Sequence, residues 1–117
     1  MHEYSVVSAL IDEVEKRAKG AGALRVALIT VKLGAQSGVD PRLLATAFET
    51  FSDRGLCAGA ELVLEEVPAR WACPRCGEAP APGGPLRCAR CERPLELKEG
   101  DEILLAHLEL EVPDHVY

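Results

Sequence analysis

The amino-acid sequence predicts an α+β fold, in which two helices pack on a roughly three-stranded sheet and a small cysteine-rich module is inserted before the last strand. Three observations lead to this prediction. Two stretches carry apolar residues at helical spacing, and three others are apolar runs or alternations typical of strands. Between the last two strands lies a segment with four of the five cysteines and almost no large aliphatic side chains. The predicted order is helix, strand, helix, strand, module, strand.

Composition limits the class of protein. The chain has 117 residues, of which 48% are hydrophobic and 4% aromatic, so an aliphatic core is expected. The net charge of −6 argues against nucleic acid or an anionic membrane as a partner, because both require clustered Lys and Arg. No apolar run is as long as a membrane span, which requires about 18 residues. The first residues of the sequence are too acidic for a signal peptide. We therefore expect a cytoplasmic protein, whose cysteines bind metal more readily than they form disulfides.

The first half of the chain contains the first helix and the first strand. Residues 4–19 show the periodicity of an amphipathic helix, which we expect to begin at Tyr4 or Ser5 and to stop at Gly20. The run LRVALITVKL at 24–33 is almost continuously apolar and rich in β-branched residues, which predicts a buried strand.

The second helix begins after Asp40, because a carboxylate at the N-cap followed by proline at the first helical position is a strong start signal. We expect it to close at Arg54-Gly55. AELVLEEV at 60–67 predicts a second strand, and alternation over 102–112 predicts a third, with Leu104 and Leu108 on one face.

The last strand most simply returns to the first sheet, which divides the chain into two parts. Residues 1–68 and 102–117 are then one α/β domain, and residues 69–101 are the inserted module. Because the last strand follows a long insertion, the connection would also allow a homodimer in which two chains exchange that strand.

The module contains two C-x-x-C knuckles, Cys73 with Cys76 and Cys88 with Cys91, separated by a loop rich in glycine and proline. Each tight turn directs two sulfur atoms to one point, and two turns complete the tetrahedral thiolate set that zinc favours. Iron in a rubredoxin-like site is the chemical alternative. Since the protein occupies all four positions, the metal is expected to be structural, and we predict a zinc-ribbon module of paired CxxC knuckles.

Zinc ribbons often bind nucleic acid, but this module shows little sign of it. Five arginines outnumber two glutamates between 70 and 93, yet four thiolates around Zn²⁺ contribute −2, so the module is nearly neutral. Trp71 is its single aromatic residue and is expected to pack at the junction with the sheet, so no stacking platform is available.

The first three residues, Met1-His2-Glu3, form a candidate second metal site. The α-amine of Met1, the amide nitrogen of His2 and its ring Nδ1 can chelate one ion, and Glu3 can add its amide nitrogen or its carboxylate. A planar set of nitrogens suits Ni²⁺ or Cu²⁺ and does not suit Zn²⁺. This chelate requires a free amine, so we expect Met1 to be retained.

Three segments together, MHEYS, VKLGAQSGVDP and ELVLEEVPARWACPRCG, resemble the HypA/HybF family of hydrogenase nickel-incorporation proteins. The resemblance implies a nickel metallochaperone that hands nickel to the [NiFe]-hydrogenase large subunit with a GTPase accessory partner, and that in some members serves urease maturation. The nickel ligands carried over are Met1, His2, Glu3 and Asp40. The zinc ligands carried over are Cys73, Cys76, Cys88 and Cys91.

Some alternatives stay open at the level of sequence. Asp40 is explained equally well as a helix cap without nickel. No nucleophile with a base, phosphate-binding glycine loop or catalytic carboxylate pair occurs, so an enzyme is not expected. The main rival is a zinc-ribbon adaptor that binds protein or nucleic acid without a second metal, and a rubredoxin-like electron carrier is the third candidate.

Overall fold

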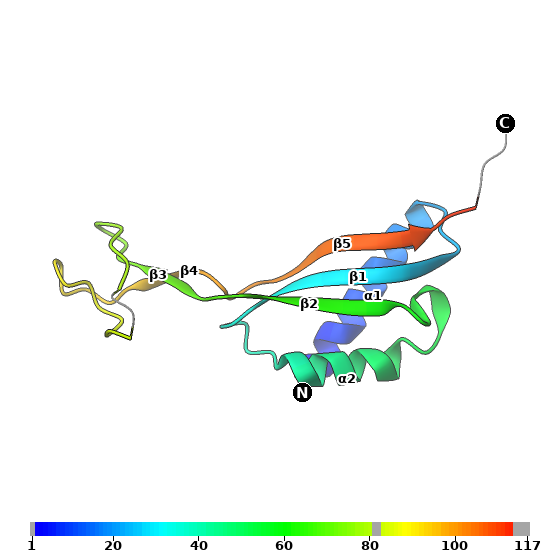
Figure 1. Ribbon diagram of the computed structural model, residues 1–117, viewed down its shortest axis with the longest axis horizontal. Coiled ribbons are helices and arrows are strands. Elements are labelled where there is room, and N and C mark those ends of the chain that lie inside the picture. The colour runs from blue at the N-terminus through cyan, green and yellow to red at the C-terminus, as the bar shows by residue number, and fades with distance from the viewer. Residues whose placement is uncertain (1, 81–82, 114–117) are drawn as a thin grey trace.

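The computed structural model describes residues 2–80 and 83–113, with the backbone alone for His2. The molecule is elongated, with extents of 63 × 36 × 19 Å, and the sheet with its helices lies at one end and the cysteine module at the other (Figure 1). The helices are α1 (His2–Gly20) and α2 (Pro41–Phe51), followed by the short 3-10 helix η1 (Gly55–Cys57). The strands are β1 (Arg25–Gly34), β2 (Glu61–Val67), β3 (Arg70–Ala72), β4 (Glu96–Glu99) and β5 (Ile103–Glu111).

The main sheet has the strand order β2-β1-β5, with β1 in the centre. β1 is parallel to β2, to which it is connected through α2, and antiparallel to β5. β1 is paired along both edges and carries the helices on one face, where Val26, Ile29, Val31 and Leu33 are buried. The expected return of the last strand to the first sheet is confirmed.

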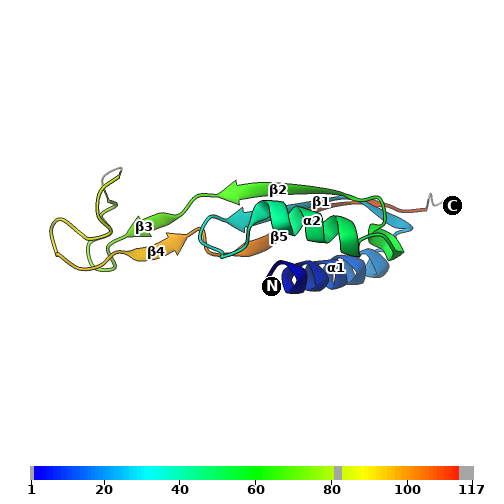
Figure 2. The ribbon, with the colours of Figure 1, turned by 90° about the horizontal axis from the view of Figure 1, so that it is seen from below.

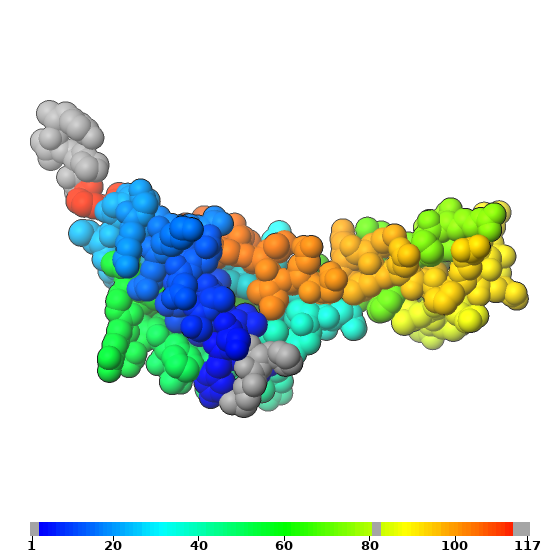
Figure 3. All heavy atoms as spheres, turned by 180° about the vertical axis from the view of Figure 1, so that it is seen from behind, coloured from blue at the N-terminus to red at the C-terminus, as the bar shows by residue number. Residues whose placement is uncertain are grey.

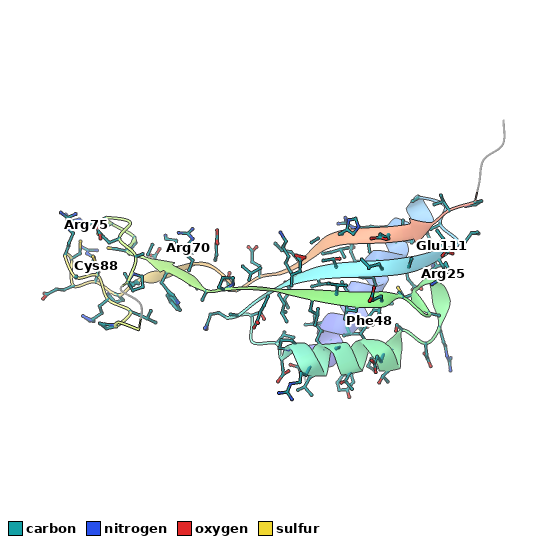
Figure 4. All side chains as sticks on the ribbon, viewed as in Figure 1. Arg25, Phe48, Arg70, Arg75, Cys88 and Glu111 are labelled. Atoms are coloured by element: carbon teal, nitrogen blue, oxygen red, sulfur yellow. The ribbon has the colours of Figure 1, made fainter. Side chains whose placement is uncertain are left out.

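Both helices lie on one face of this sheet and enclose the core (Figure 2). Phe48 of α2 points toward the strands, as Figure 4 shows, and is only 3% exposed. Aliphatic side chains make up most of the core: Val7, Leu10, Val14, Ala18, Val26, Ile29, Val31, Leu33, Leu44, Ala47, Phe48 and Cys57. The α+β class, with two helices on a three-stranded sheet, is therefore confirmed.

Each helix differs from the sequence prediction at one of its two ends. α1 begins at His2 and not at Tyr4 or Ser5, so the Glu3 carboxylate lies in the first turn, where it favours the positive end of the helix. α2 ends at Phe51, where the N–H of Ser52 donates to the carbonyl of Phe48. Gly55 therefore starts the following 3-10 helix and does not close α2.

The predicted faces of the last strand are wrong, because β5 contains a bulge. Thr30 pairs with His107, but the next residue of β1 pairs with Leu105, so Ala106 is an extra residue. An extra residue reverses the faces of the side chains on one side of it. Leu105 therefore packs on the core together with Leu108, whereas Leu104 is 49% exposed.

A second, two-stranded sheet of β3 and β4 connects the main sheet to the cysteines, and it was not predicted from the sequence. In Figure 1, β2 runs on into β3 and β4 runs on into β5, so the two outer strands of the main sheet continue as a ribbon. Among the residues that the structure describes, no helix combines the length and the apolar character needed to cross a membrane.

Candidate metal centres

The first knuckle is a turn closed by two backbone hydrogen bonds. The N–H of Gly77 donates to the carbonyl of Cys73 at 2.9 Å, and the N–H of Cys73 donates to the carbonyl of Glu78 at 3.0 Å. Gly77 has a left-handed φ of 74°, which glycine adopts without steric cost. The turn is preceded directly by β3, so the ribbon determines where the knuckle lies.

The second knuckle repeats this geometry fifteen positions later, without a glycine. The N–H of Glu92 donates to the carbonyl of Cys88, and the N–H of Cys88 donates to the carbonyl of Arg93, both at 2.9 Å. Glu92 has a left-handed φ of 55° at the position that Gly77 occupies in the first knuckle. A non-glycine residue held in that conformation is costly, so the rest of the knuckle must stabilise it.

The four sulfur atoms of Cys73, Cys76, Cys88 and Cys91 all lie within 4.8 Å of one another. A tetrahedral zinc ion with Zn–S bonds of about 2.3 Å requires sulfur atoms about 3.8 Å apart, so the cluster fits zinc with small adjustments. Within the described residues it is the one group of three or more His, Cys, Asp or Glu side chains arranged to hold a metal.

Backbone amides and crowding give the thiols of this cluster very different acidities. The N–H groups of Cys76 and Arg75 lower the pKa of Cys73 to about 6. The pKa of Cys76 is raised to about 12: the N–H of Glu78 works against the rise, but hydrogen bonding with Cys88 and burial outweigh it. The cluster thus readily holds one thiolate, and a divalent cation is needed to stabilise four.

The module has a small core of its own, and the cysteines are its main part. Cys73, Cys88 and Leu95 are buried together, and Trp71 packs against them. Trp71, which was expected to pack at the junction, lies in β3 and packs against the cysteine cluster. Figure 4 shows Cys88 inside the module and Arg75 at its outer surface. Folding of the module consequently depends on the sulfur cluster.

The other candidate centre lies where the first turn of α1 meets the start of α2. The backbone N–H of Asp40 donates to Oε2 of Glu3 at 3.3 Å, across 37 positions of sequence. At the other end of α2, the rings of Tyr4 and Phe51 meet edge to face, with centroids 5.3 Å apart. This ring contact is a second attachment of α1 to α2, away from Asp40.

Asp40 caps α2 as predicted. Its Oδ1 accepts from the N–H of Arg42 at 2.8 Å and from the N–H of Leu43 at 3.3 Å, with Pro41 at the first helical position. The structure thus brings together two of the four predicted nickel residues, Glu3 and Asp40. Met1 and the side chain of His2 lie outside the described residues.

Comparison with known proteins decides the family. A family model described as hydrogenase/urease nickel incorporation, metallochaperone, hypA matches residues 1–110. The chain belongs to the HypA family. This family consists of nickel metallochaperones of hydrogenase maturation and not of enzymes, as the absence of catalytic motifs had predicted.

Individual relatives agree with the family model. The chain is 43% identical to the hydrogenase maturation factor HypA of Wolinella succinogenes over 117 residues, covering 97% of this chain and 98% of the relative. It is 41% identical to HypA of Shewanella halifaxensis over 113 residues, covering 95% and 98%. Among solved structures, the Ni metallochaperone HypA from Helicobacter pylori has a TM-score of 0.74 at 31% identity, with 95% of this chain and 98% of that chain covered.

Proposed function

We propose that the protein binds Ni(II) through Met1, His2 and Glu3, with Asp40 beside them, and delivers the ion to the [NiFe]-hydrogenase large subunit. The observation that carries this proposal is the hydrogen bond from the N–H of Asp40 to Oε2 of Glu3. It holds the first turn of α1 against the N-cap of α2, so that Glu3 and Asp40 lie side by side. Membership of a nickel metallochaperone family supports the choice of ion.

The position of the chelate at a helix start favours metal binding by backbone nitrogen. The first four N–H groups of a helix have no carbonyl acceptor within the helix, and α1 begins at His2. The amide nitrogens of His2 and Glu3 can therefore lose their protons to a metal without breaking a helical hydrogen bond. Two deprotonated amides also neutralise the charge of Ni²⁺, which would otherwise oppose the positive end of the helix.

In this proposal the carboxylate of Asp40 contacts the nickel ion and caps α2 at the same time. Both hydrogen bonds that the structure gives its carboxylate end on Oδ1. Oδ2 can then face a nickel ion while Oδ1 continues to cap α2. The side chain of Glu3 is engaged by the backbone of Asp40, so we assign Glu3 a positioning role through its carboxylate and a ligand role through its amide nitrogen.

We further propose that Cys73, Cys76, Cys88 and Cys91 hold a resident structural zinc ion, which stabilises residues 69–101 as a separate module beside a nickel-binding domain of 1–68 and 102–117. The closeness of the four sulfur atoms supports this assignment. Zinc supplies charge that keeps all four thiols deprotonated, and with four protein ligands it offers no position to a substrate.

Release of nickel from a chain terminus suits transfer, because the ligands can leave one after another. We expect a GTPase nickel-insertion protein to cooperate in that step and urease maturation to be a second destination, consistent with the family description. β5 follows the whole module in the chain, so a homodimer formed by exchange of this strand between two copies also remains a prediction.

The test is a titration of tag-free, zinc-loaded protein with Ni²⁺, in which binding is measured by calorimetry and by absorption spectroscopy. His2→Ala should abolish nickel binding and leave zinc content unchanged. His107→Ala is the matched control: His107 is exposed on β5, with Nε2 3.3 Å from Oε2 of Glu109, and its loss should leave nickel binding intact.

An uncleaved extension before Met1 gives an independent check, because it converts the amine to an amide. Unchanged nickel affinity in the extended protein or in His2→Ala would show that the terminal chelate is wrong. Zinc-loaded wild type that takes up no nickel would instead favour the zinc-ribbon adaptor, and red, redox-active protein would indicate iron at the cysteines.

A further inference from the structure

The main sheet narrows to a ribbon at one place, which we call the strand joint: residues 34–36, 67–70 and 99–102. β1 separates β2 from β5 up to Gly34, and beyond it the continuations of those outer strands pair directly as β3 and β4. In Figure 3 this joint is the narrow middle of the molecule, between the body and the cysteine module. The joint connects the main sheet to the cysteine module.

Backbone hydrogen bonds fasten the chain leaving β1 to both outer strands. The N–H of Gly34 donates to the carbonyl of Glu102 at 2.9 Å, and the N–H of Ala35 donates to the carbonyl of Val67 at 2.8 Å. The N–H of Gln36 donates to the carbonyl of Gly100 at 2.6 Å. Three consecutive residues thus hold both connections to the ribbon.

Two glycines allow these backbones to touch. A Cβ on Gly34 would lie 2.2 Å from the carbonyl oxygen of Gly100, and a Cβ on Gly100 would lie 2.7 Å from Cα of Ala69. Gly100 also has a left-handed φ of 103°. All of these neighbours are backbone atoms, which cannot rotate away as a side chain would, so a side chain at either glycine would force the strands of the joint apart.

From the joint, a short chain of contacts leads to the candidate nickel site. The N–H of Ser37 donates to the carbonyl of Gly34 at 3.0 Å, and the N–H of Val39 donates to Oγ of Ser37 at 3.3 Å. The next residue is Asp40, whose N–H is held by Glu3. The loop between β1 and α2 is therefore ordered by hydrogen bonds from the joint to the N-cap.

We propose that the strand joint is a rigid coupling, in which Gly34 and Gly100 lock the zinc module onto the loop that carries Asp40. Movement of the module then moves this loop, and a partner that grips the module acts on the carboxylate of Asp40. The coupling itself is independent of nickel, and only its consequence for metal binding rests on the function proposed above. Gly34 and Gly100 are accordingly positioning residues.

The decisive measurement uses zinc-loaded wild-type protein and no nickel. Residual dipolar couplings of backbone N–H groups are collected for β1, β2 and β5 and, separately, for β3 and β4. A rigid joint requires one alignment tensor to fit both sets, with the same magnitude and orientation. Two tensors of different magnitude would show that the module moves independently, and would overturn the proposal.

Variants test the role of the glycines. Gly100→Ala should release the N–H of Gln36, raise its hydrogen-exchange rate about fivefold, and give the two sheets separate tensors. Gly22→Ala is the matched control, because Gly22 has a left-handed φ of 71° but nothing within 4 Å of an added Cβ. It should leave the Gln36 rate and the common tensor unchanged. Equal rates and a common tensor in both variants would contradict the role of Gly100.

The nickel arm separates the two proposals. If Gly100→Ala has lost the common tensor, its affinity for Ni²⁺ should fall while that of Gly22→Ala does not. Wild type that binds no nickel but shows one tensor would refute the proposed function and leave the joint in place. Unchanged nickel affinity in a decoupled Gly100→Ala protein would refute the transmission to Asp40.

Discussion

Substitution of Asp40 by Asn and by Ala separates its two roles. The carboxylate accepts hydrogen bonds from the N–H groups of Arg42 and Leu43 at the start of α2. Asn retains an oxygen acceptor and is as good an N-cap as Asp, so Asp40→Asn removes little more than the charge. Ala removes the acceptor as well, which costs about 1 kcal/mol for a helix cap. For a chain of this size that loss lowers the Tm by about 4 °C.

The measurements are thermal unfolding of the zinc-loaded protein and calorimetric titration with Ni²⁺. Asp40→Ala should lose both stability and nickel affinity, whereas Asp40→Asn should keep a Tm within about 2 °C of wild type, reflecting only the charge at the helix start, and still lose nickel affinity. Wild-type nickel affinity in Asp40→Asn would refute the ligand role. An unchanged Tm in Asp40→Ala would refute the capping argument.

Three further predictions concern the core and its edges. Leu33→Ala, at a side chain only 1% exposed, should destabilise the fold by about 2–5 kcal/mol in chemical denaturation, and a smaller loss would mean that the core collapses around the site. Glu15→Ala should cost about 1–3 kcal/mol, because Oε2 of Glu15 accepts from the N–H of Leu56 at 3.1 Å. Glu13→Ala, which removes only the exposed pair with Arg17, should cost clearly less. Burial, aided by the charge of Glu15, raises the pKa of Cys57 from 9.0 to about 11. Between these two pH values the folded state keeps a proton that the unfolded state releases, so the free energy of unfolding should fall as the pH rises from 9 to 11. Cys57→Ala should flatten that part of the pH profile.

Much of the metal chemistry follows from local sequence. A C-x-x-C spacing determines a knuckle almost by itself, since the hydrogen bonds that close it span four or five residues. The same holds for the cap of α2, where Asp40 and Pro41 act on the next turn of their own helix. Glu92 shows the limit of such local rules, because its left-handed conformation is imposed by the knuckle and not favoured by its residue type.

Periodicity predicted the elements but not their details. Apolar spacing identified both helices and all three strands of the main sheet, because each buries one stripe or face. The bulge at Ala106 escaped prediction, since alternation in β5 alone does not show how β1 pairs with it. β3 and β4 escaped as well, because they are short and their residues are mostly charged.

The amino-acid sequence alone therefore determined the composition of both candidate metal sites, the aliphatic core and the order of its elements. These are properties of residue type and near-neighbour spacing. Tertiary structure alone decided that Glu3 meets Asp40 and that Gly34 meets Gly100, contacts between segments far apart in the chain. Such contacts depend on how β1 pairs with both outer strands and on where the helices cross. These contacts cannot be predicted from a single segment of the sequence, because the residue that completes each contact lies elsewhere in the chain.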